Sequence, residues 1–195
     1  MNDLGAIVLA AGASTRMKKQ KMLLPYGDET IIERVIKNIK SVIEFNIHVV
    51  LGSHFEEISK KISNLQVDIC INENYPDGML SSVIRGFDAV SENVKAVLVF
   101  LGDQPQIPPE VSRKVLAAWS ESEKGIIIPT FDGRRGHPTL IETGYRDEIR
   151  NLDKNQGLRQ LMKIFQDDVY EVECGRNEIL RDIDTPEDYQ NEIRS

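Results

Sequence analysis

The feature that most constrains the fold is a series of short, almost wholly apolar runs separated by segments of helical periodicity. The clearest runs are GAIVL at residues 5–9, IHVVL at 47–51 and AVLVFL at 96–101. Runs of this kind are typical of strands buried on both faces of a sheet. A helical stripe follows the first run, opened by a capping-box pair at Thr30 and Glu33. The alternation predicts an α/β fold of three layers, α/β/α, with a Rossmann-like, mainly parallel sheet.

The alternation continues through the middle of the chain and breaks after Pro129. The same patterns predict strands at 67–71 and 126–128, and helices at 80–87 and from Pro109 onward. Beyond the break, residues 137–141 and 169–174 read as strands outside the simple rhythm, with a helix at 157–165 between them. We expect these late strands to form an antiparallel edge of the sheet.

The composition argues against nucleic-acid and membrane partners. Lys and Arg total 24 and Asp and Glu total 31, so the net charge is −7, and an acidic chain is repelled by anionic surfaces. A length of 195 residues fits one domain with a single sizeable core. Cys70 and Cys174 form no CxxC pair, which favours buried thiols in a reducing compartment. With no signal-peptide pattern and no apolar run near the ~20 residues that span a bilayer, we expect a cytoplasmic protein.

The first candidate site segment follows the opening strand and reads LAAGASTRMKKQK, residues 9–21. Ligands of such sheets bind beyond the carboxyl ends of the strands. Gly12 lets the backbone approach a ligand, and successive N–H groups in such a turn form an anion-binding concavity. Cations gather here in an otherwise acidic chain, at Arg16, Lys18, Lys19 and Lys21. The segment predicts a phosphate grip, and the alternative is an ordinary turn with solvated cations.

Two further segments follow strands. In NYPDGMLSSVIRGF, Ser81 and Ser82 stand near a helix start, where hydroxyls either cap the helix or read the polar edges of a base. In VFLGDQPQIPPE, Asp103 comes directly after an apolar strand. A carboxylate in that position is suited to Mg²⁺, which prefers oxygen ligands, and the alternative is an aspartate that only forms the turn.

The segment DIDTPEDY, residues 182–189, admits two interpretations. It reads as a helix start, with Thr185 or Asp184 as the cap and Pro186 in the first turn. Asp182 and Asp184 also share one side of an extended chain, so either is a candidate second metal carboxylate. His137, in the loop GRRGHPTL, is a candidate pocket residue. No nucleophile–base pair can be assembled, which suits nucleotidyl transfer, since that chemistry relies on positioning and charge neutralisation.

Together these segments resemble the MobA-like nucleotidyltransferases, especially the molybdenum cofactor cytidylyltransferases. The resemblance is carried, in the family's order, by LAAGASTRMKKQKMLLPYG, DGMLSSVIRGF, GDQP, GHP and DIDTPEDY. Ala11 stands where guanylyltransferases tend to have glycine, which looks like the pyrimidine-using pattern. Lys18 and Leu80 stand where many relatives have glycine. The resemblance implies a fold of the nucleotide-diphospho-sugar transferase type, with residues 1–195 as a single nucleotidyltransferase domain.

The resemblance also implies a reaction and a role for each candidate residue. CMP would pass from CTP to the terminal phosphate of molybdopterin, giving molybdopterin cytosine dinucleotide and pyrophosphate, with Mg²⁺ as cofactor. The catalytic residues would be Arg16, Lys21 and Asp103. The nucleotide would be bound by Leu9, Ala10, Ala11, Gly12, Arg16, Lys21, Gly78, Ser81 and Ser82. The metal ligands would be Asp103 and Asp184, and the acceptor side would carry His137 and Asp182.

Two alternatives stay open from the sequence. The first keeps the nucleotide chemistry and changes the acceptor to a sugar phosphate or methylerythritol phosphate. The second is non-catalytic: a chaperone that delivers molybdopterin to an apoenzyme, or a degenerate nucleotide sensor. An enzyme of this kind is also expected to be able to contact a molybdenum hydroxylase directly.

Overall fold

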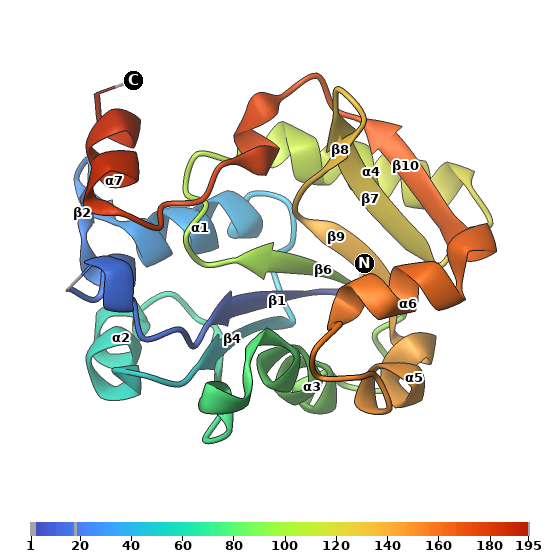
Figure 1. The fold of residues 1–195 in the computed structure, drawn as a ribbon, viewed down its shortest axis with the longest axis horizontal. Coiled ribbons are helices and arrows are strands. Elements are labelled where there is room, and N and C mark those ends of the chain that lie inside the picture. Colours follow the sequence, from blue (N-terminus) through green and yellow to red (C-terminus); the bar gives the residue numbers. More distant parts are fainter. Residues whose placement is uncertain (1–2, 18, 195) are drawn as a thin grey trace.

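The central sheet carries the fold, and the computed structural model describes it within residues 3–17 and 19–194. The described strands lie in the order β10-β7-β9-β6-β1-β4-β5, with β8 paired to β7 (Figure 1). Their bounds are β1 (Leu4–Ala10), β4 (Ile47–Leu51), β5 (Asp68–Ile71), β6 (Ala96–Leu101), β7 (Ile126–Phe131), β8 (Arg134–Arg135), β9 (Thr139–Glu142) and β10 (Val169–Glu173). A separate two-stranded ribbon is formed by β2 (Pro25–Tyr26) and β3 (Glu29–Thr30). Lys18 lies outside the described residues.

The sheet is mainly parallel, as predicted, but its longer antiparallel strand, β9, lies inside the sheet and not at the edge. β1 pairs in parallel with β4 and β6, and β4 pairs in parallel with β5. β9 lies between β6 and β7 and is antiparallel to both, whereas β10 forms the edge and is parallel to β7. The lengths of the connections explain why β9 is antiparallel to β7 and β10 is parallel to it. The short loop after β7 only allows β9 to return antiparallel, while the longer, helical connection before β10 allows a parallel crossover.

Helices cover both faces of the sheet (Figure 1). One face packs against α1 (Ile31–Lys40), α2 (Phe55–Ile62) and α4 (Pro109–Glu121). The other face packs against α3 (Met79–Ala89), α5 (Arg146–Arg150) and α6 (Leu158–Ile164). Side chains of β1 alternate between the two cores, because Ala6 and Val8 join the first and Ile7 and Leu9 the second. This alternation gives each face of the sheet its own apolar core covered by helices, so the predicted three-layer arrangement is confirmed.

Short helices and capping residues complete the chain. In α1, the Glu33 carboxylate accepts hydrogen bonds from the Thr30 N–H at 2.8 Å and the Thr30 hydroxyl at 2.7 Å. The last helix, α7 (Pro186–Glu192), has Thr185 as its cap, so the helix-start interpretation of DIDTPEDY is confirmed. The 3₁₀ turns are η1 (Thr15–Met17), η2 (Lys21–Leu23), η3 (Tyr75–Asp77), η4 (Thr143–Tyr145), η5 (Gln166–Asp168) and η6 (Asn177–Leu180). No helix of the described chain is long and apolar enough to cross a bilayer.

Candidate functional site at the carboxyl edge of the sheet

The turn after β1 is joined to the neighbouring strand ends. The Leu9 carbonyl accepts a hydrogen bond from the Gly102 N–H at 3.0 Å, and the Ala11 carbonyl accepts one from the Ser53 N–H at 3.0 Å. Leu9, Ala10 and Ala11 are buried. Gly12 is exposed, and open space surrounds the position that a Cβ would take there. Of the predicted nucleotide-binding positions in this turn, Gly12 is therefore the one most accessible to a ligand.

The loop from Gly12 to Lys21 is closed by Ser14 and Gln20. Ser14 adopts a left-handed conformation with φ of 52°, and its hydroxyl donates to Gln20 Oε1 at 2.9 Å. The same hydroxyl oxygen accepts a hydrogen bond from the Lys21 N–H at 3.2 Å. These contacts direct Lys21 back toward the strand ends. Ser14 and Gln20 were not among the site residues predicted from the sequence. The signal that could have indicated them is that both are polar residues at the ends of a basic loop.

A cluster of cations and carboxylates lies where the loop ends. Lys21 Nζ contacts Asp103 Oδ2 at 2.5 Å and Asp184 Oδ1 at 2.9 Å. A second cation, Arg16, contacts Asp184 Oδ2 at 2.8 Å. The Lys21 side chain is 11% exposed and that of Arg16 is 68% exposed, so the lysine is enclosed and the arginine faces solvent. The structure thus brings together four predicted site residues from three distant parts of the chain.

The pKa values in this cluster reflect burial opposed by ion pairing. For Lys21, burial lowers the pKa, but Asp103 and Asp184 outweigh it, and the net pKa is raised. For Asp184, burial raises the pKa, but Lys21 and Arg16 outweigh it, and the net pKa is lowered. Both shifts favour the charged forms. The ion pairs therefore hold Lys21 and Asp184 in their charged forms at neutral pH.

Asp182 and His137 border the same cluster. Burial first, and then the charges of Asp103 and Asp184, raise the pKa of Asp182. Its Oδ1 accepts a hydrogen bond from Gln104 Nε2 at 2.8 Å. Burial lowers the pKa of His137, opposed by the Val99 carbonyl near its Nδ1 and by the charge of Asp103. His137 and Asp182, the two residues predicted for the acceptor side, thus both lie close enough to Asp103 to be influenced by its charge.

Gln104 was missed by the sequence analysis. It is buried at 4% exposure, and its amide holds both Asp182 and the Arg181 carbonyl. Its position next to Asp103 in the GDQP turn was the signal that could have found it.

The predicted base-reading segment is organised by Asn72, which the sequence analysis also missed. The buried Asn72 donates through Nδ2 to Ser81 Oγ at 2.9 Å and to Ser82 Oγ at 3.0 Å. The Ser81 hydroxyl donates to the carbonyls of Gly78 and Asn74. Gly78, at φ of 101°, is the N-cap of α3, so neither serine caps the helix. Among the described residues, no hydrogen bond joins this segment to the Lys21 cluster.

The donor set of the cluster fits a hard divalent cation. Asp103 and Asp184 both reach one Lys21 ammonium, so both can reach one cation, and carboxylate oxygens suit Mg²⁺. Within residues 3–17 and 19–194, however, no three His, Cys, Asp or Glu side chains are gathered as a preformed metal centre. Lys21 stands between the two acids, so a metal held by both would require the ammonium to move away.

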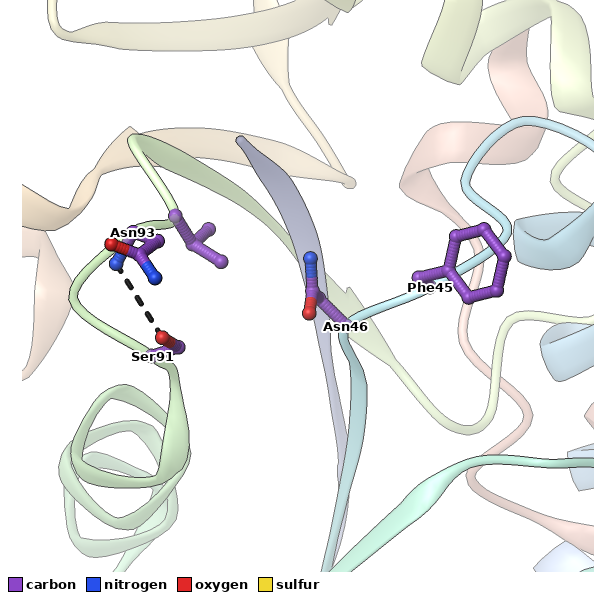
Figure 2. A pocket seen from close by; sticks show the side chains of 5 residues that line it. Phe45, Asn46, Ser91 and Asn93 are labelled. Carbon is purple, nitrogen blue, oxygen red and sulfur yellow. Dashed lines mark hydrogen bonds between the residues drawn. The ribbon is translucent and has the colours of Figure 1, made fainter. Parts of the chain in front are cut away.

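Among the described residues, one cavity of about 340 Å³ borders the cluster and another of about 340 Å³ lies away from it. The first is lined by residues that include Gln106, Asp182, Ile183 and Asn191. Figure 2 shows the second, where Phe45 and Asn46 precede β4 and the other lining residues precede β6. That second cavity lies at the amino ends of the strands. It is therefore remote from the edge where ligands of such sheets bind.

Comparisons with known proteins agree with this geometry. Residues 6–171 match the family described as the MobA-like NTP transferase domain. The chain is 31% identical over 192 residues to the molybdenum cofactor cytidylyltransferase of Escherichia coli (strain K12), covering 97% of this chain and 95% of that protein. It is 26% identical over 193 residues to the nicotine blue oxidoreductase of Paenarthrobacter nicotinovorans, covering 93% of this chain and 92% of that protein.

Solved structures share the fold. Rv0371c from Mycobacterium tuberculosis H37Rv superposes with a TM-score of 0.87 at 24% identity, covering 99% of this chain and 98% of that one. Its complex with manganese superposes with a TM-score of 0.78 at 22% identity, covering 99% of each chain. The fold and matches define a protein of the nucleotidyltransferase class. The chain belongs to the MobA-like NTP transferase family, so the family and fold class inferred from the sequence are confirmed.

Proposed function

We propose that this protein transfers CMP from CTP to the terminal phosphate of molybdopterin, in the form that carries molybdenum. An oxygen of the acceptor phosphate forms a bond to the α-phosphorus of CTP, the bond from that phosphorus to the bridging oxygen breaks, and pyrophosphate leaves. The observation that carries the proposal is the Lys21 ammonium shared by Asp103 and Asp184 beside the exposed Gly12 turn. Similarity to the cytidylyltransferase of E. coli supports the choice of substrates.

In this proposal the catalytic residues act by binding and charge neutralisation. Backbone around Gly12 faces the triphosphate, and Arg16 and Lys21 neutralise charge that develops on the departing pyrophosphate. Asp103 and Asp184 hold Mg²⁺, which when bound stabilises negative charge on the phosphate oxygens. The Lys21 ammonium, where those acids hold the metal, would contact the triphosphate instead. No general base is needed, because the attacking phosphate oxygen is already ionised.

Base choice and acceptor binding are assigned to the flanking segments. Gly78, Ser81 and Ser82 lie near the cytosine, on the frame that Asn72 builds. The Ala11 methyl group limits the room for a purine, an effect of about 1–3 kcal/mol for a difference of this size. His137 and Asp182 face the acceptor. Residues 1–195 act as one nucleotidyltransferase domain, and the reaction takes place in the cytoplasm, where product can pass by contact to a molybdenum hydroxylase.

The test is a product assay with purified protein. CTP, GTP or ATP is combined with molybdopterin and Mg²⁺, and pyrophosphate and the dinucleotide are measured. We expect the dinucleotide to form with CTP and not with GTP or ATP. Pyrophosphate release only with a sugar phosphate or methylerythritol phosphate would replace the proposed acceptor. Binding of molybdopterin without turnover would favour the chaperone alternative. Because one relative is named an oxidoreductase, the same preparation is also assayed for redox activity, and we expect none.

The Asp103→Asn variant tests the proposed metal role within the same assay. We expect loss of turnover by at least about 100-fold with the fold retained, because removal of a metal ligand or of its support costs 10–100-fold or more. Asp68→Asn is the matched control, since that side chain is 72% exposed and lies on the edge strand β5. Full activity of Asp103→Asn would remove this residue from the mechanism.

A further inference from the structure

The segment that carries Asp182 and Asp184 lies outside the sheet. In Figure 1 it is the red chain between β10 and α7, which passes over the carboxyl edge near the end of β6. From 181 to 185 the chain is neither helix nor strand. Its position therefore depends on contacts other than ladder hydrogen bonds.

Two glutamine amides supply several of those contacts. Gln104 Nε2 donates to the Arg181 carbonyl at 3.1 Å and to Asp182 Oδ1 at 2.8 Å. Gln106 Nε2 donates to the same Arg181 carbonyl at 2.6 Å and to the Glu178 carbonyl at 3.3 Å. Both glutamines belong to the turn that follows β6 and begins with Asp103. The turn that presents one acid of the cluster therefore also holds the segment that presents the others.

The contacts define the register of this segment as well as its location. The Ile183 N–H donates to the Asp103 carbonyl at 3.2 Å, and the Ile183 side chain is 2% exposed in a cluster with Met17 and Ile31. In an extended chain, neighbouring side chains point to opposite faces. Burial of Ile183 on one face therefore places Asp182 and Asp184 on the other. A slip by one residue would put Ile183 or Thr185, neither of them an acid, where Asp184 meets Lys21.

We propose that Gln104 and Gln106 act as a clasp that sets the register of Asp182 and Asp184 against Asp103 and Lys21. They are positioning residues, because they act through the acids and not on a substrate. The expected effect of these glutamines on turnover rests on the proposed function. Their expected effect on the position of the 181–185 segment does not. Of the two glutamines, Gln104 contributes more to positioning the segment, since it is buried and also contacts a site carboxylate.

Hydrogen exchange tests the clasp without any substrate. In Gln104→Leu, similar in size but without an amide, we expect peptides spanning 179–185 to lose protection while peptides from β1 and β6 keep theirs. Gln160→Leu is the matched control, because that glutamine accepts a hydrogen bond from the Asp153 N–H in an exposed turn beside α6. Unchanged protection at 179–185 in Gln104→Leu would overturn the proposal. If this variant does not fold, Gln106→Leu, at a half-buried position, gives the same measurement.

A double-mutant cycle separates positioning from a loss of stability. We expect Gln104→Leu to lower kcat/KM by about 10–100-fold, as for residues that orient a metal ligand. In an Asp182→Ala background the same change should cost much less, because the acceptor of the Gln104 amide is already absent. Strictly additive losses would contradict the clasp. If the wild-type protein forms no product from CTP, the proposed function fails, and the exchange experiment still decides on the clasp.

Discussion

At the scale of single residues, the site is governed by the enclosed ammonium of Lys21. Burying an ammonium is costly unless carboxylates neutralise it, and Asp103 and Asp184 both do so here. Sequence reasoning found Arg16, Lys21, Asp103 and Asp184, because each follows a strand or precedes a helix at the expected edge. It missed Ser14, Gln20, Asn72 and Gln104. Their roles are hydrogen bonds to other site residues, and the sequence signal for such bonds is only their position in or beside the predicted site segments.

The lowered pKa of Asp184 makes part of the stability pH-dependent. Burial raises this pKa, but Lys21 and Arg16 lower it below the ordinary value of 3.8. A folded pKa below the unfolded one adds stability that is complete above the unfolded value and is lost as pH falls through the folded value. We therefore expect wild type to exceed Asp184→Asn in free energy of unfolding at pH 7, with the gap closing below about pH 4.

Urea denaturation of both proteins between pH 7 and pH 3 measures that gap. Added salt should reduce it in part, because Arg16 is 68% exposed and its ion pair is screened by ions. A gap that stays constant down to pH 3 would show that Asp184 does not carry this stabilisation.

At the scale of elements, local pattern predicted most helices and strands and misjudged one relationship between them. β4 and β6 have the predicted bounds, and the Thr30–Glu33 contacts open α1 as expected. The position of β9 inside the sheet was not foreseen, since its sequence does not say which strands it will pair with. Strand order is a choice among long-range pairings that are equally compatible with an apolar run.

The close contact of α3 with β1 gives a prediction at this scale. A Cβ at Gly86 would lie 2.5 Å from Ile7 Cγ2, a contact at the centre of the second core. We expect Gly86→Ala to lower the free energy of unfolding by about 1–3 kcal/mol, because overpacking outweighs the gain in helix propensity. Gly144→Ala is the control, since its Cβ would meet no atom within 4 Å. Chemical denaturation measures both, and equal stability of the two variants would contradict the packing argument.

At the scale of the whole molecule, three distant segments meet at one edge of the sheet. The 9–21 loop, the 103–106 turn and the 178–184 segment close on one another through Lys21, Gln104 and Gln106. We expect a ligand bound at the Lys21 cluster to contact all three segments. Binding to the folded state alone should therefore stabilise the entire protein.

Thermal unfolding with nucleotides measures this coupling. At a concentration of 100 times Kd, a ligand adds about 2.7 kcal/mol to the free energy of unfolding. We expect CTP with Mg²⁺ to raise Tm more than GTP or ATP does, and Lys21→Met to lose most of the increase. Equal shifts with all three nucleotides would contradict the proposed cytidine preference, while leaving nucleotide binding intact.

Local sequence pattern was enough to predict the class of fold, most of the helices and strands, and the candidate site positions that follow the strands. These depend on periodicity, caps and turn residues, which act between near neighbours in the chain. The ion pairs of Lys21 with both Asp103 and Asp184, which lie 82 and 163 residues from it in sequence, could be identified only in the folded structure. The physical reason is that such contacts form between surfaces assembled by folding, and a local pattern carries no information about its distant partner.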